Sequence, residues 1–96
     1  MKDVMEDVIR KHMIFSGRVQ GVGFRYHAQY AAQACGLTGW VRNRYDGTVE
    51  MEVQGRRETI EQMIKTLHAG RYIQIDRIDA EPLPVEQEEY SFQIRD

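Results

Sequence analysis

The sequence predicts an α+β fold in which one sheet carries two helices on one of its faces, all within a single domain of 96 residues. Three observations support this prediction. Segments that alternate apolar and polar residues are interleaved with two segments of helical spacing, in the order strand-helix-strand-strand-helix-strand. Each helical segment has one apolar stripe, which must be buried against the sheet. The length allows one hydrophobic core, and the chain has no internal repeat and no linker.

The first strand is expected within residues 11–19, KHMIFSGRV, where Met13 and Phe15 alternate with more polar neighbours. This strand would open the domain, which we place at residues 11–96. Residues 1–10 are expected to form an N-terminal extension. The spacing of the apolar residues in this extension would also fit a short amphipathic helix.

The first helix is expected in residues 26–36, YHAQYAAQACG, because this stretch is rich in alanine and has no internal glycine or proline. Gly36 is a natural place for the helix to end. A second strand follows in residues 38–45, TGWVRNRY. The pair Asp46–Gly47 then predicts a type I′ hairpin turn, in which both central residues take positive φ.

The third strand has the clearest pattern in the chain. In residues 48–54, TVEMEVQ, apolar side chains alternate with glutamate and glutamine, so one face is expected in the core. The second helix is expected in residues 56–70 and should end at Gly70. Its single apolar stripe consists of Ile60, Met63, Ile64 and Leu67.

Two further strands complete the predicted sheet. Residues 72–81, YIQIDRIDAE, form a strand whose alternation breaks between Ile75 and Ile78, which indicates a bulge. Two prolines then close this strand. Residues 90–94, YSFQI, form a short extra strand at the C-terminus. The β-α-β-β-α-β order predicts a ferredoxin-like sandwich with an antiparallel sheet and both helices on one face.

Composition narrows the functional classes. The formal net charge is −2, whereas a nucleic-acid binder normally shows a basic excess, so no nucleic-acid partner is expected. No stretch approaches the ~20 apolar residues of a membrane span, and the N-terminus does not read as a secretory signal. The lone Cys35 cannot form an internal disulfide, and the three histidines lack metal-ligand spacing. We therefore expect a cytoplasmic protein. A small domain with one core and no obvious exposed apolar stripe also favours a monomer.

The stretch Gly17 to Arg25, GRVQGVGFR, joins the first strand to the first helix. The N-terminus of a helix has unpaired N–H groups and a partial positive charge, so anions bind there. Gly21 and Gly23 would let the loop fold back so that successive N–H groups converge on an anion. Arg25 can hold two phosphate oxygens at once with its planar guanidinium. The pattern therefore favours a site for a phosphate group.

Other interpretations of these residues remain open at this point. The stretch would also fit an ordinary glycine-rich connection whose arginines face water, and Arg18 is an alternative anion ligand. Asn43, in the second strand, would also fit a residue that satisfies a nearby main-chain group. GVGFRY resembles the aromatic motif of RNA-recognition domains, which share the same element order. In those domains, however, the aromatic residues lie on a later, central strand and stack on bases.

Two segments resemble the signatures of the acylphosphatase family at every fixed position. GRVQGVGFR matches G-x-V-Q-G-V-x-F-R, and GWVRNRYDGTVE, Gly39 to Glu50, matches G-x-V-x-N-x-x-D-G-x-V-E. The resemblance extends from about residue 11 to the C-terminus. It implies a ferredoxin-like fold and the hydrolysis of carboxyl-phosphate mixed anhydrides without metal or cofactor. It also implies that Arg25 grips the phosphate and that Asn43 orients the attacking water.

From this resemblance we expect a small-molecule acyl phosphate as substrate. We expect the phosphate to be bound by Gln20, Gly21, Val22, Gly23, Phe24 and Arg25. The chain differs from the family in its longer start and in residues 69–74, AGRYIQ, where many members carry a Gly-Pro loop. These differences concern the rim of the site and substrate preference. An acylphosphatase-like domain of a large hydrogenase maturation protein is an alternative, but a single cysteine and an end at Asp96 favour an independent small enzyme.

Overall fold

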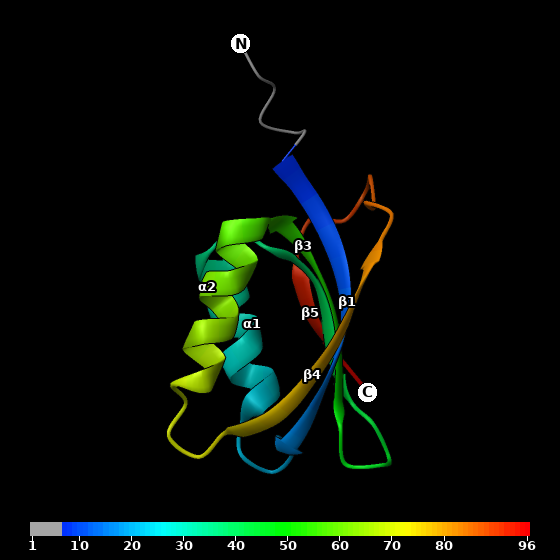
Figure 1. Ribbon diagram of the computed structural model, residues 1–96. Coiled ribbons are helices and arrows are strands. Elements are labelled where there is room, and N and C mark those ends of the chain that lie inside the picture. The colour runs from blue at the N-terminus through cyan, green and yellow to red at the C-terminus, as the bar shows by residue number, and fades with distance from the viewer. Residues whose placement is uncertain (1–6) are drawn as a thin grey trace.

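The computed structural model describes residues 7–96, which form one sheet of five strands and two helices on one face of it (Figure 1). The strands are β1 (Val8–Arg18), β2 (Thr38–Asn43), β3 (Val49–Arg56), β4 (Gln74–Leu83) and β5 (Phe92–Arg95), and the helices are α1 (Phe24–Ala34) and α2 (Arg57–His68). The predicted β-α-β-β-α-β order is confirmed, including the short strand at the C-terminus. Within residues 7–96, no helix is long and apolar enough to span a bilayer.

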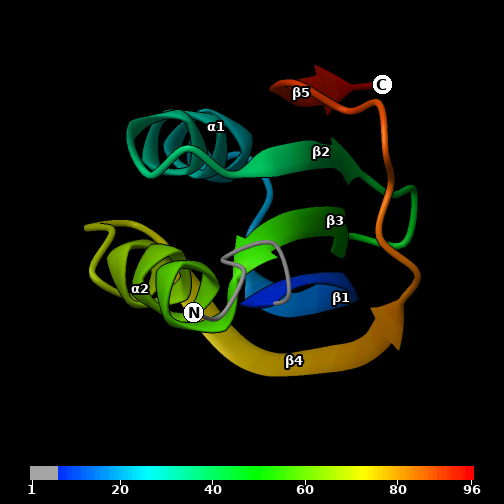
Figure 2. The same ribbon diagram turned by 90° about the horizontal axis from the view of Figure 1, so that it is seen from above.

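The strand order across the sheet is β4-β1-β3-β2-β5. The pairs β1–β3, β1–β4 and β2–β3 are antiparallel as expected, but β2–β5 is parallel, so the sheet is mixed. After β4 the chain crosses the sheet on the side away from the helices and reaches the opposite edge (Figure 2). Because the chain reverses direction in this crossing, β5 runs antiparallel to β4 and therefore parallel to β2.

The core lies between the sheet and the two helices. The alternation predicted for the third strand is confirmed, since Val49, Met51 and Val53 of β3 are fully buried. Phe24, the first residue of α1, is 1% exposed, and its ring lies 5.0 Å from that of Phe15 on β1. Tilted aromatic pairs at this distance are favourable beyond their buried area. This contact fixes the N-terminus of α1 against the sheet.

The first strand begins earlier than predicted. Residues 8–10 lie in β1 and pair with residues 54–56 of β3, so the amphipathic helix considered for this segment does not form at these positions. The physical reason is that β3 extends to Arg56 and offers main-chain partners to the start of β1. Residues 1–6 lie outside the described part of the chain.

The β2–β3 turn differs from the predicted type I′ turn. Gly47 takes φ 91°, but no residue other than glycine in the described range has positive φ, so Asp46 does not. The amide of Gly47 donates to the oxygen of Arg44, and the amide of Arg44 donates to the oxygen of Thr48. This is the pattern of a three-residue loop that ends in a left-handed glycine. The Asp46 carboxylate also accepts hydrogen bonds from the amide and hydroxyl of Thr48, which stabilises this alternative turn.

The predicted bulge in the fourth strand is confirmed. Ser16 of β1 pairs with Arg77, but Gly17 pairs with Ile75, so Asp76 is the extra residue in β4. The main chains approach closely here, because a Cβ on Gly17 would lie 2.3 Å from the oxygen of Gln74. Gly17 therefore lets β4 pack against the end of β1, just before the chain enters the loop that leads to α1.

Candidate active site

Residues 19–23, which we call the anion loop, connect β1 to α1 and are shaped by two glycines. Gly21 and Gly23 take φ of 72° and 79°, in the left-handed region that glycine adopts without strain. Gly23 is the N-cap of α1 and leaves the helix without a side-chain cap. The N–H groups of residues 20–23 donate to no acceptor within residues 7–96. Together with the free N–H groups of the first helical turn, they can hold an anion.

The anion loop is tied to the β2–β3 turn by one side chain. The Nε2 of Gln20 donates to the main-chain oxygens of Arg44 and Thr48, at 2.6 and 2.8 Å. These bonds occupy the side-chain amide of Gln20, which therefore supports the loop. The main-chain N–H of Gln20 is still available to bind an anion.

A cavity of about 220 Å³ lies between the anion loop, the first turn of α1 and the end of β2. We call it the Arg25–Asn43 cavity. The residues that line it are Val19, Gly21, Gly23, Phe24, Arg25, Tyr26 and Asn43. The structure thus brings together five of the residues predicted for the site, from two segments of the chain. Gln20 and Val22 do not line it, because Gln20 turns to the β2–β3 turn and Val22 packs against the core.

Arg25 is the cationic residue of this cavity. It lies in the first turn of α1 and is half-buried, and it forms no ion pair or side-chain hydrogen bond with any other described residue. Its guanidinium donors therefore remain available to a ligand. Arg18, the alternative anion ligand, is exposed and lines a separate cleft beside Gly47 and Asp76. Of the two arginines, only Arg25 faces the cavity that Asn43 also lines.

Asn43 ends β2, where it pairs with Val49 of β3. Its Oδ1 is buried and has no hydrogen-bond partner in the described part of the chain. Buried polar atoms are almost always hydrogen-bonded, so an unpaired one requires an explanation. The interpretation in which Asn43 satisfies a nearby main-chain group does not account for this oxygen. A polar group inside the cavity, such as a water molecule, would donate to it.

Two lining residues were not among the predicted site residues. Val19, the first residue of the anion loop, is fully buried and forms part of the cavity wall. Tyr26 is 69% exposed and borders the cavity from the first turn of α1. The sequence signal for Tyr26 was its position directly after Arg25, since neighbouring residues of a first helical turn surround the same helix end.

Comparisons with known proteins agree with the two motifs. The family model described as Acylphosphatase matches residues 11–94. An acylphosphatase from Geobacillus kaustophilus is 48% identical over 86 residues, which cover 88% of this chain and 92% of that relative. The structure of an acylphosphatase from Coxiella burnetii aligns with a TM-score of 0.86 at 31% identity, over 99% of this chain and all of that one. The structure of an acylphosphatase from Bacillus subtilis aligns with a TM-score of 0.83 at 32% identity, over 91% of this chain and 98% of that one.

Proposed function

The chain belongs to the acylphosphatase family and is an acylphosphatase, and from this we propose that the Arg25–Asn43 cavity is its catalytic centre. The reaction is the hydrolysis of an acyl phosphate to a carboxylate and inorganic phosphate. The observation that carries the proposal concerns the described residues 7–96. Among them, the Arg25 guanidinium and the buried Oδ1 of Asn43 have no partner and line one cavity, beside main-chain N–H groups that are also free. These groups match the needs of an anionic substrate and a water molecule.

The phosphoryl group would be held by the anion loop and Arg25. Phosphoryl transfer spreads negative charge over three equatorial oxygens, and fixed donors aimed at them provide most of the acceleration. The N–H groups of residues 20–24 and the Arg25 guanidinium are such donors. The carboxylate is a good leaving group, so the reaction needs little help from a general acid.

Asn43 would orient the attacking water. Its Oδ1 accepts a hydrogen bond from the water, which places the water oxygen in line for attack on phosphorus. The new P–O bond forms as the bond from phosphorus to the acyl oxygen breaks, and the acyl group leaves as a carboxylate. An amide is not a base, so the proton of the water passes to an oxygen of the substrate's own phosphoryl group.

The proposal includes hydrolysis without a metal ion or cofactor. Its support is that Arg25 already supplies positive charge at the cavity, and that the described lining residues carry no carboxylate, imidazole or thiol. An assay in the presence of a chelator tests this part directly. Full activity in excess EDTA is expected, whereas loss of activity that added Mg²⁺ restores would contradict it.

Phosphate binding can be tested independently of turnover. We expect inorganic phosphate to shift the amide NMR signals of residues 20–25, because these N–H groups contact the anion. Arg25→Ala should weaken this response strongly, and Arg18→Ala should leave it nearly unchanged because Arg18 lines a separate cleft. Shifts centred on the Arg18 cleft would contradict the proposed site.

The proposal also takes the protein to be a cytoplasmic monomer that acts on a small molecule. A role in RNA binding is disfavoured by the burial of Phe24, which is 1% exposed and cannot stack on a base. A gel shift with single-stranded RNA tests this alternative, and sedimentation equilibrium tests the monomer. Salt-dependent RNA binding at micromolar protein would contradict the assignment of a small-molecule substrate.

A further inference from the structure

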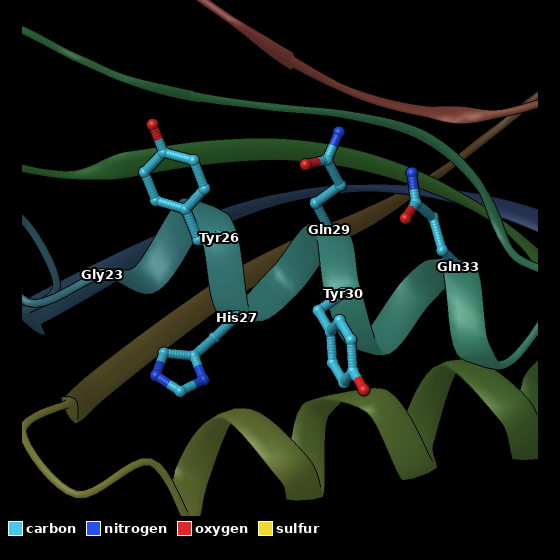
Figure 3. A pocket seen from close by; sticks show the side chains of 6 residues that line it. All are labelled: Gly23, Tyr26, His27, Gln29, Tyr30 and Gln33. Atoms are coloured by element: carbon cyan, nitrogen blue, oxygen red, sulfur yellow. The ribbon is translucent and has the colours of Figure 1, made fainter.

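A second hollow lies directly beside the Arg25–Asn43 cavity, on the outer face of α1. It has a volume of about 460 Å³, and we call it the α1 groove. The residues that line it are Gly23, Tyr26, His27, Gln29, Tyr30 and Gln33 (Figure 3).

The groove runs between two rows of side chains along α1. Figure 3 shows Tyr26, Gln29 and Gln33 projecting from one side of the helix, and His27 and Tyr30 from the side where α2 lies. The wall at Gln29 is held in place, because its Nε2 donates to the oxygen of Phe92 at 3.2 Å. The groove therefore has a fixed polar wall and an aromatic ring on each side.

The two tyrosines of the groove are open to solvent, as are the other three tyrosines of the chain. Tyr26 is 69% exposed and Tyr30 is 79% exposed, while the alanines on the opposite face of α1 pack into the core. Exposed aromatic side chains that gather beside a cavity are typical of binding surfaces. Neither ring fills the core, and Tyr26 differs from the other exposed tyrosines in that it lines both the groove and the Arg25–Asn43 cavity.

The α1 groove and the Arg25–Asn43 cavity share two residues, Gly23 and Tyr26. The shared residues lie at the N-terminus of α1, where the phosphoryl group of a substrate would bind. An acyl phosphate held there by Arg25 would extend its acyl group either into solvent or past Tyr26 into the groove. The groove is thus a surface next to the phosphate site that can contact the part of the substrate that is not phosphate.

We propose that the α1 groove binds the acyl group of the substrate, and that Tyr26 is a specificity-determining residue that favours aromatic acyl groups. The inference rests on the proposed catalytic centre and adds the substrate class. Aromatic rings stack favourably at the edges and faces of tyrosine, whereas a methyl group has no ring to stack. The lining side chains are tyrosine, glutamine and histidine, which suits an uncharged ring better than a charged chain.

The test compares benzoyl phosphate with acetyl phosphate, which share the reacting group and differ in the acyl group. Tyr26→Ala should lower the ratio of kcat/KM for benzoyl phosphate to that for acetyl phosphate by about five- to tenfold, as expected for a lost ring contact. The loss should appear mainly as a higher KM for benzoyl phosphate. Tyr30→Ala should lower the ratio by roughly twofold, because it lies farther from the phosphate site.

Two variants serve as controls. Tyr26→Phe keeps the ring and should retain the preference for benzoyl phosphate. This variant distinguishes the contribution of the ring from that of the hydroxyl. Tyr90→Ala removes a ring that is 83% exposed and lines neither hollow, so the ratio should not change. The three alanine variants, at Tyr26, Tyr30 and Tyr90, change exposed side chains and are expected to fold, which circular dichroism verifies.

The outcomes separate this inference from the proposed function. If the wild type hydrolyses both substrates and Tyr26→Ala lowers the ratio, the inference holds. If the wild type hydrolyses both substrates and the ratio stays the same in Tyr26→Ala, the groove does not bind the acyl group, and the catalytic centre is unaffected. If the wild type hydrolyses neither substrate, both the catalytic centre and the groove assignment are wrong.

Discussion

The side-chain amide of Gln20 donates a hydrogen bond of 2.8 Å to the main-chain oxygen of Thr48, on the far side of the β2–β3 turn. A second bond from the same nitrogen reaches the oxygen of Arg44 at 2.6 Å. The anion loop precedes Arg25, and the β2–β3 turn follows Asn43. Gln20 therefore fixes the two segments of the proposed catalytic centre relative to each other, although its side chain does not line the cavity.

Gln20→Ala tests this connection. The two lost hydrogen bonds should reduce the free energy of unfolding by about 1–2 kcal/mol. Because small displacements of catalytic groups reduce rates steeply, kcat/KM should fall roughly tenfold or more. Gln62→Ala, at an exposed position of α2, is the matched control and should change neither quantity. Unchanged kcat/KM in Gln20→Ala would show that the loop is positioned by other contacts.

Asn43→Ala should reduce kcat by about 10²-fold while leaving inhibition by inorganic phosphate nearly unchanged, since the amide is proposed to hold water rather than phosphate. Its Oδ1 has no hydrogen-bond partner among residues 7–96, so truncation should not lower the free energy of unfolding appreciably. Steady-state kinetics and urea denaturation measure the two effects. Asn43→Asp is the matched variant, and its negative charge should weaken phosphate inhibition. Equal loss of turnover and phosphate binding in Asn43→Ala would make Asn43 a structural support instead.

A buried arginine on the outer face of the sheet holds the segment between β4 and β5. Arg10 is 3% exposed, and it donates to Glu89 at 2.7 Å and to Glu52 at 3.0 Å. Burial alone would lower the pKa of Arg10, but the hydrogen bonds and negative charges of Glu89 and Glu52 outweigh it and raise the pKa. Arg10 therefore stays charged, and its positive charge stabilises the negative charges of Glu89 and Glu52.

Arg10→Met should lower the free energy of unfolding by about 3 kcal/mol, because it leaves two largely buried carboxylates without their cation. Arg77→Met is the matched control, since Arg77 is 73% exposed and pairs with Asp79 in solvent. An exposed pair of this kind contributes less than about 1 kcal/mol. Urea denaturation of both variants measures the difference. A loss in Arg10→Met no larger than in Arg77→Met would contradict this account of the buried cluster.

The same cluster makes stability depend on pH in the acid range. Burial alone would raise the pKa of Glu89, but its hydrogen bond with Arg10 and the charge of Arg10 outweigh this and lower the pKa below the usual value of 4.5. A lowered pKa in the folded state stabilises the protein above about pH 4.5, and this stabilisation is lost as the pH falls through the folded-state pKa. Glu89→Gln should therefore weaken the decline of the urea midpoint below pH 4.5. An identical decline in Glu89→Gln and wild type would contradict the role of Glu89.

Local patterns in the sequence predicted most of the elements that surround the site. The alternation around Met51 and the helical stripe of α2 each report the burial of one face, which is a local property of the chain. The parallel β5 was not predicted, because its direction depends on how residues 84–91 cross the sheet. The form of the β2–β3 turn was not predicted either. The Asp46 carboxylate accepts hydrogen bonds from Thr48, and the main chain of Asp46 keeps a negative φ.

The sequence could predict the parts of the candidate site that consist of main-chain N–H groups and of a charged side chain. The spacing of Gly21, Gly23 and Arg25 indicated an anion site, and the three residues line one cavity. The wall formed by Tyr26 was missed, because the exposure of a helical side chain depends on which face of the helix packs against the sheet. The role of the Gln20 side chain was missed as well, because its acceptors lie in a distant part of the chain.

The most direct test of the account is the hydrolysis of benzoyl phosphate by wild type, Arg25→Ala, Arg25→Lys and Arg18→Ala in excess EDTA. We expect turnover by the wild type, and a loss in kcat/KM of about 10²–10³-fold or more in Arg25→Ala, as for the removal of one aligned donor. Arg25→Lys should lose most of this activity, because a point charge cannot form two parallel hydrogen bonds. Arg18→Ala should remain close to wild type. Near-normal kcat/KM in Arg25→Lys, or no turnover by the wild type, would contradict the central claim that Arg25 holds the phosphoryl group.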